Sequence, residues 1–82
     1  MEMGLNSDIR VDQKDFHIQT EDWGWDNPFI VTKIFSQGAV VKSVKTPYNQ
    51  VVSSRLFSDN AIVEALKKQH DEILGRVISG EF

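Results

Sequence analysis

Two histidines and a few acids are the residues of this chain that could do chemistry together. His17 lies in a polar stretch near the N-terminus, and His70 lies near the C-terminus. Two imidazoles and a carboxylate from Glu21 or Asp22 would form a metal site if folding brought them together. The chain has no HxxxH or HExxH spacing, which would place two such ligands on one helix face. We therefore expect no metal and no other cofactor. A small-ligand or metal site at His17, Glu21, Asp22 and His70 is the alternative function.

Catalytic chemistry has little support in the sequence. The chain has no cysteine, no GxSxG elbow, no P-loop and no GxGxxG. The acids Glu21, Asp22 and Asp26 lie near the two tryptophans, where paired carboxylates could act on a glycosidic bond. Acids in a loop are more often solvated turn residues, and a domain this small rarely encloses a substrate pocket. We assign no catalytic residue, and we favour a function other than that of an enzyme.

The two tryptophans, Trp23 and Trp25, flank Gly24. In an extended segment their side chains would point the same way and form an aromatic platform for a peptide, a sugar or a base. We favour the other interpretation, in which at least one ring covers an open end of the core. The candidate binding residues are the polar and aromatic residues of this stretch and the helical histidine: His17, Gln19, Glu21, Asp22, Trp23, Trp25 and His70.

Composition limits the protein class. The chain has 82 residues, which is one domain, and the absence of cysteine excludes disulfides and Cys-based zinc or redox sites. The net charge of −3 argues mildly against a nucleic-acid binder. The hairpin lysines Lys33, Lys42 and Lys45 could bind an anion weakly, but lysines more often protect strand edges from aggregation. No apolar run is long enough to span a membrane, and the N-terminus lacks the apolar region of a signal peptide, so we expect a cytoplasmic protein.

Alternating apolar and polar residues predict strands in the first half of the chain. We expect a flexible tail over residues 1–7 and an antiparallel sheet over residues 8–45. Phe16, Ile18 and Thr20 alternate with polar neighbours, which is typical of a half-buried strand. Residues 29–35 and 39–45 form the strongest strand pair.

The turn of this pair can be argued from charge. A two-residue turn would place Lys33 directly opposite Lys42, which costs stability. A three-residue turn over residues 36–38, with Gly38 left-handed in a bulge, avoids this pair, and we predict it. That register gives one apolar face: Ile30, Ile34, Val40 and Val44. The opposite face then carries Phe29, Val31, Phe35 and Val41, mixed with Lys33, Ser43 and Lys45. One helix covers one face, so the other needs water, the N-terminal segment or a second copy of the protein.

The second half of the chain predicts helix. Within a connector over residues 46–57, Thr46 reads as an N-cap and Pro47 as the first position of a short helical turn at 48–53. A long helix over residues 58–80 begins at the cap Ser58, and Gly80 is its stop signal. Its apolar stripe contains Ile62, Val63, Leu66, Ile73, Leu74 and Val77. His70 lies within this stripe and faces the sheet, so it is either a hydrogen-bonded core histidine, which we favour, or an acid, base or ligand.

Together these elements predict an α+β fold. We expect a three- to four-stranded antiparallel β-meander with the long C-terminal α-helix packed on one face. Because no catalytic group is evident, we expect a non-enzymatic protein-interaction or regulatory module. Its partner would be itself, as a homodimer, or another protein. Binding to nucleic acid is disfavoured, and no membrane contact is expected.

The run FHIQTEDWGWDNPFIVTKIFSQGAVVKSVKTPY resembles a group of short bacterial proteins. Their pattern is H-[IV]-Q-T-E-D, then N-P, an I-V-T strand, a Gly turn and K-T-x-Y, with a later Gln-His pair in the closing helix. The resemblance covers residues 16–80. It implies a bacterial origin but no activity, because the group is uncharacterised. The matching positions are His17, Gln19, Thr20, Glu21, Asp22, Asn27, Pro28, Tyr48, Gln69 and His70.

Overall fold

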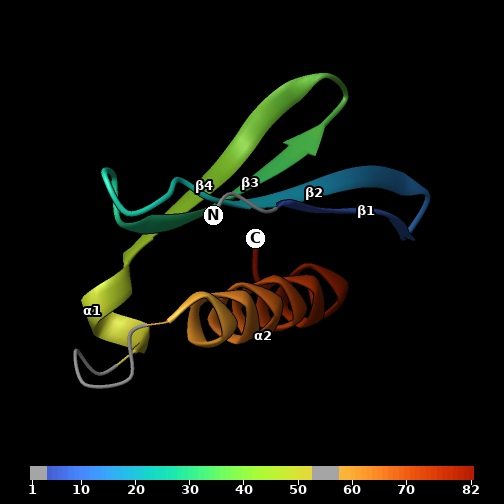
Figure 1. Ribbon diagram of the computed structural model, residues 1–82. Helices are drawn as coiled ribbons and strands as arrows, with labels where there is room; N and C mark the ends of the chain where they lie inside the picture. The colour runs from blue at the N-terminus through green and yellow to red at the C-terminus, as the bar shows by residue number, and fades with distance from the viewer. Residues whose placement is uncertain (1–3, 53–57) are drawn as a thin grey trace.

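The computed structural model describes residues 4–52 and 58–82 as one antiparallel sheet with a long helix against one of its faces (Figure 1). The strands are β1 (Gly4–Val11), β2 (Lys14–Asp22), β3 (Phe29–Ser36) and β4 (Ala39–Pro47), and the helices are α1 (Tyr48–Val51) and α2 (Asp59–Ile78). The strand order β1-β2-β3-β4 makes a four-stranded meander, which confirms the predicted α+β class. No helix in the described part is long and apolar enough to cross a membrane.

The first strand begins earlier than predicted. Residues 4–7, which were expected in a flexible tail, belong to β1 and pair with the second half of β2, so that Ser7 lies opposite Ile18. The period of two continues back to Leu5, which packs against the core. Sequence alternation alone gave too short a strand because polar residues separate Leu5 from Ile9. The rest of the expected tail, residues 1–3, lies outside the described residues.

The β3–β4 turn corrects the predicted turn length. Gln37 and Gly38 form a two-residue turn with left-handed φ values of 54° and 80°, as in a type I′ turn. The like-charge pair is avoided by a bulge within β4 instead. Phe35 lies opposite Val40 and Ile34 opposite Lys42, which leaves Val41 unpaired in the ladder. Lys33 therefore faces Ser43. The bulge also places Val40 beside Phe35, on the face opposite to Ile34 and not with it as predicted.

Helix α2 begins where its sequence predicts. The Ser58 hydroxyl accepts a hydrogen bond from the Ala61 backbone N–H at 3.1 Å, which satisfies an orphan donor of the first turn. The short helix α1 was also predicted, but with Thr46 as its N-cap. Pro47 is extended (φ −63°, ψ 146°) and is itself the N-cap, since β4 continues through it. The last part of the predicted connector, residues 53–57, lies outside the described residues.

The core between α2 and the sheet has two apolar clusters. One surrounds Leu66 of the helix and Ile30 of β3, and the other surrounds Ile73 of the helix and Ile18 of β2. A polar band separates them on both elements. It consists of the buried side chains of Thr20, Thr32, Gln69 and His70. The helix therefore meets the sheet through an apolar, a polar and a second apolar layer.

Candidate functional site

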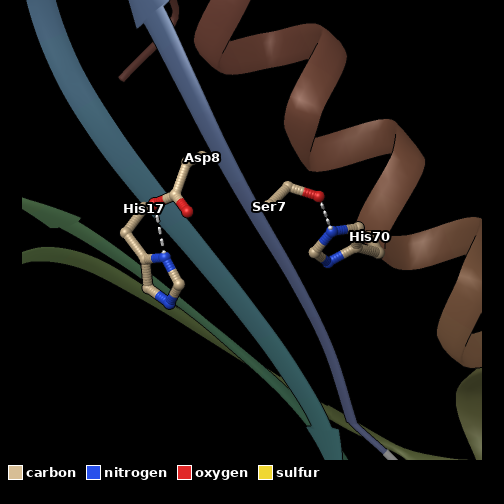
Figure 2. A network of polar contacts seen from close by, with 4 residues as sticks. All are labelled: Ser7, Asp8, His17 and His70. Atoms are coloured by element: carbon tan, nitrogen blue, oxygen red, sulfur yellow. Dashed lines mark hydrogen bonds and ion pairs between the residues drawn. The ribbon is translucent and has the colours of Figure 1, made fainter.

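The two histidines lie on opposite faces of the sheet. His70 is on α2 and faces β1 from one side, while His17 is on β2 and pairs with Asp8 on the other side (Figure 2). We call the α2 side the inner face and the opposite side the outer face. The structure therefore does not bring the four residues of the alternative site together. Asp22 shares the inner side with His70, whereas Glu21 shares the outer face with His17. Among the described residues, no three metal-ligating side chains form a group that could hold a metal ion.

His70 is a hydrogen-bonded core histidine, as favoured from the sequence. Its Nε2 lies 2.8 Å from the Ser7 hydroxyl and its Nδ1 lies 2.7 Å from the Thr20 hydroxyl. Thr20 also lies 2.7 Å from the Thr32 hydroxyl, which accepts a hydrogen bond from Gln69 Nε2 at 3.0 Å. The five residues form one continuous polar chain across three strands and the helix.

Donor counting fixes the direction of this chain. Gln69 Nε2 can only donate, so the Thr32 hydroxyl accepts from it and has its own proton to give to Thr20. Thr20 then donates to Nδ1 of His70, and the ring carries its proton on Nε2. In the opposite direction, the hydroxyl proton of fully buried Thr32 would have no acceptor among the described contacts, which is costly.

This direction decides what His70 can do. The ring donates from Nε2 to the Ser7 oxygen, so it does not accept the Ser7 proton and does not activate Ser7 as a nucleophile. Burial lowers the pKa of His70 below its usual 6.5, with the nearby carboxylate of Asp71 opposing this shift. The neutral ring with one donor and one acceptor matches its surroundings. We assign the polar band a structural role.

Asp22 and Tyr48 hold the corner between β2 and α1. Asp22 is buried, and its Oδ1 accepts hydrogen bonds from the Gly24 backbone N–H at 3.0 Å and from the Tyr48 hydroxyl at 3.2 Å. Burial, and then the carboxylate of Asp22, raise the pKa of Tyr48 to about 12. Both hydrogen bonds fix the loop conformation at Gly24, which has a left-handed φ of 87°. Asp22, a candidate binding residue, is thus part of the fold's interior.

The two tryptophans diverge and do not form one platform. Trp23 packs edge-on against Phe29, and the Lys45 ammonium lies 5.0 Å from the centre of its ring. Trp25 packs perpendicular to the buried ring of Tyr48 at 5.3 Å and donates to Asp59 at 3.3 Å. Trp25 therefore covers Tyr48 at the end of the core, as favoured for at least one tryptophan. Both tryptophan residues are substantially exposed, 38% for Trp23 and 44% for Trp25.

The outer face carries the remaining candidates, His17, Gln19 and Glu21. The strand register aligns its side chains in rows across all four strands. One row is Asp8–His17–Phe35–Val40, the middle row is Asn6–Gln19–Lys33–Ser43, and a third is Gly4–Glu21–Val31–Lys45. The ring centres of His17 and Phe35 are 5.8 Å apart, and Val40 is 51% exposed. Apolar groups thus occupy both ends of the face, with Phe29 and Trp23 beyond the third row, and a polar row lies between them.

Charge is divided across the outer face. The β1–β2 half carries the acids Asp8, Asp15 and Glu21 with the single cation Arg10, and the β3–β4 half carries Lys33 and Lys45. The lysine Lys45 is held in place by aromatic rings, since its ammonium is 4.2 Å from the centre of Phe29. Of these residues, sequence reasoning selected Glu21 as a site candidate and noted the lysines, but it missed the pattern. The charge pattern follows from the pairing register of the strands, and the incorrectly predicted β3–β4 turn had hidden that register.

No protein-family model, no curated protein and no solved structure matches this chain.

Proposed function

We propose that this protein is a non-enzymatic protein-interaction module that binds a protein partner, a second copy or another chain, through the outer face of its sheet. The observation that carries the proposal is the difference between the two faces. Helix α2 packs on the inner face, while in the described part no helix lies over the outer face, where aromatic and aliphatic side chains occupy both ends (Figure 1). Exposed apolar groups with a polar middle are typical of interfaces between proteins.

The chemistry of this face favours a protein over a nucleic acid. Its three cations, Arg10, Lys33 and Lys45, are matched by the three acids Asp8, Asp15 and Glu21. A phosphate backbone needs a surface on which cations prevail, because neutralised phosphates supply most of the affinity. A face with both signs of charge and with aromatic groups suits a folded protein surface. A bacterial origin and a cytoplasmic location stay predictions.

The direct test places a photo-crosslinking amino acid on each surface of the molecule. We replace Gln19 on the outer face with p-benzoylphenylalanine, and we replace Glu64 on the exposed side of α2 as the matched control. Irradiation in cells should link the Gln19 variant to one or a few discrete proteins, its own chain included. The Glu64 variant should give only monomer. Equal products from both positions, or none from Gln19, would refute the proposal.

A further inference from the structure

We infer that the partner on the outer face is a second copy of this chain, packed face to face about a two-fold axis parallel to the strands. This inference rests on the proposed function, because it needs the outer face to be a binding surface. The observations behind it are the charge division across the face, the position of its apolar ends and the size of the sheet.

The charge division selects one of two symmetric arrangements. A two-fold axis parallel to the strands places β1 of one copy over β4 of the other, and β2 over β3. The acidic half of each copy then faces the lysines of its partner, so Glu21 of one copy lies near the side chains of Lys33 and Lys45 of the other. An axis across the strands would place each half over its own kind, acid over acid and lysine over lysine, which is unfavourable.

The apolar ends keep their positions in this arrangement. Rotation about an axis along the strands leaves each row at its own height, so the row of His17 and Phe35 meets the same row of the partner copy. His17 of one copy then faces Phe35 of the other, an aromatic contact that already exists within each chain at 5.8 Å. Sheets packed in this aligned way lie about 10 Å apart with strands about 30° from parallel.

The size of the face sets the expected strength. Four strands spaced about 4.8 Å apart and about eight residues long give a face of about 500 Å² per copy, or about 1,000 Å² for the pair. This is the lower end of specific interfaces. We therefore expect a reversible dimer with a dissociation constant on the order of micromolar. The charges set the orientation, because exposed ion pairs add little affinity by themselves.

The first experiment reverses each half of the face separately. Lys33→Glu with Lys45→Glu makes both halves acidic, and Asp8→Lys with Glu21→Lys makes the acidic half basic. Sedimentation equilibrium of the wild type should show a concentration-dependent rise from the 9.4 kDa monomer toward twice that mass. Each variant alone should dimerise at least tenfold more weakly, and an equimolar mixture of the two should regain dimer.

Lys45 also contacts aromatic rings, so its replacement could loosen the fold. Lys33→Glu alone changes the same half and leaves those ring contacts intact, and it should weaken dimerisation in the same direction. Circular dichroism of each variant checks that the sheet and helix are retained.

The second experiment tests the axis. The chain has no cysteine, so single cysteines can be introduced at Asn6 on β1 and Ser43 on β4, both exposed in one row of the outer face. We mix Asn6→Cys with ¹⁵N-labelled Ser43→Cys and add a short bis-maleimide crosslinker. The mixed product should dominate over both homotypic products, and Glu64→Cys on α2 should give none. Dominant homotypic products would overturn the proposed axis.

Failure of this inference is distinguishable from failure of the proposed function. A wild type that stays monomeric up to about 1 mM overturns the second copy as partner. The photo-crosslink from Gln19 to a different protein would in that case still support the outer face as a binding surface. A dimer that survives both charge reversals alone would instead place the interface elsewhere and overturn the inference.

Discussion

The two histidines of this protein show how differently its two sheet faces treat the same side chain. On the inner face, His70 is 4% exposed, and both of its ring nitrogens have hydroxyl partners from β1 and β2. On the outer face, the His17 side chain is 36% exposed and pairs with Asp8, whose side chain is 85% exposed. The inner contact connects residues 63 positions apart, and the outer contact joins residues only 9 apart. Imidazole thus has a structural role on one face and stays partly exposed on the other.

The largest expected effect is the difference in stability lost when each of the two histidines is truncated to alanine. His70→Ala should lower the free energy of unfolding by about 3 kcal/mol, because it leaves a cavity and strands the hydroxyls of Ser7 and Thr20. His17→Ala should lower it by less than about 1 kcal/mol, since an exposed pair with Asp8 contributes little. Urea unfolding of both variants measures the difference. Ser7→Ala, which removes only one partner of His70, provides an intermediate value of about 1 kcal/mol if His70→Ala does not fold. Equal losses for the two histidines would contradict the assignment of faces.

A second prediction concerns a substitution that breaks the hydrogen-bond network around His70 without opening a cavity. Thr20→Val keeps the side-chain shape but leaves Nδ1 of His70 and the Thr32 hydroxyl proton unpaired, at a cost of about 2 kcal/mol. In the wild type, long-range ¹H–¹⁵N NMR should find the His70 proton on Nε2 and Nδ1 unprotonated. A proton on Nδ1 would show that the hydroxyl chain runs the other way and that His70 can accept from Ser7. Thr46→Val, at a half-buried threonine of β4 that lies outside this hydrogen-bond network, is the matched control.

Acidic pH should lower the stability of the protein through the buried ring of His70 on the inner face. The folded-state pKa of His70 lies below the unfolded value of 6.5, because burial disfavours the charged ring. The unfolded chain therefore takes up the proton first. The contribution of His70 is complete above about pH 6.5 and declines as the pH falls toward the folded-state pKa, by up to about 1.4 kcal/mol per pH unit. The measurement compares unfolding of the wild type and His70→Gln between pH 7.5 and pH 5. Parallel curves for the two proteins would contradict this prediction.

The smallest effect is expected on the outer face. Val40→Thr, at a half-exposed position, should change the stability of the dilute monomer by less than about 0.5 kcal/mol. Its effect should emerge only at concentrations where copies associate, because the methyl group that it removes lies in the proposed interface. Thermal melting at low protein concentration measures the effect on the monomer, and melting at high concentration measures the effect on association. A large loss in the dilute monomer would mean that this face contributes to the fold itself.

Much of this architecture was readable from local patterns. The meander, the helix with its Ser58 cap and the inward position of His70 all follow from periodicities of two and 3.6 residues. These features depend on neighbours in sequence. The partner type of His70 was also foreseeable, because Thr20 lies on the same strand face as the apolar residues and needs a hydrogen bond when buried.

The errors arose where distant residues decide. Ser7 was assigned to a tail because its burial depends on α2, far along the chain. The β3–β4 turn was given a third residue to separate two lysines, whereas the protein separates them with a bulge further along β4. The divided charge of the outer face also depends on that register. Cross-strand pairing is set by the whole sheet, so local sequence left it open.

The bulge at Val41 has a consequence for how this sequence can change length. Because Val41 has no partner in the ladder, its removal would leave every β3–β4 pair in place and turn β4 into a regular strand. Removal of Ser43 instead would also eliminate the bulge, but it would place Lys33 opposite Lys42, the like-charge pair that the bulge avoids. A shorter homologue could therefore lack one residue at position 41 and keep the fold. In a sequence alignment, a gap there would be neutral, whereas a gap two residues later would bring the two lysines together.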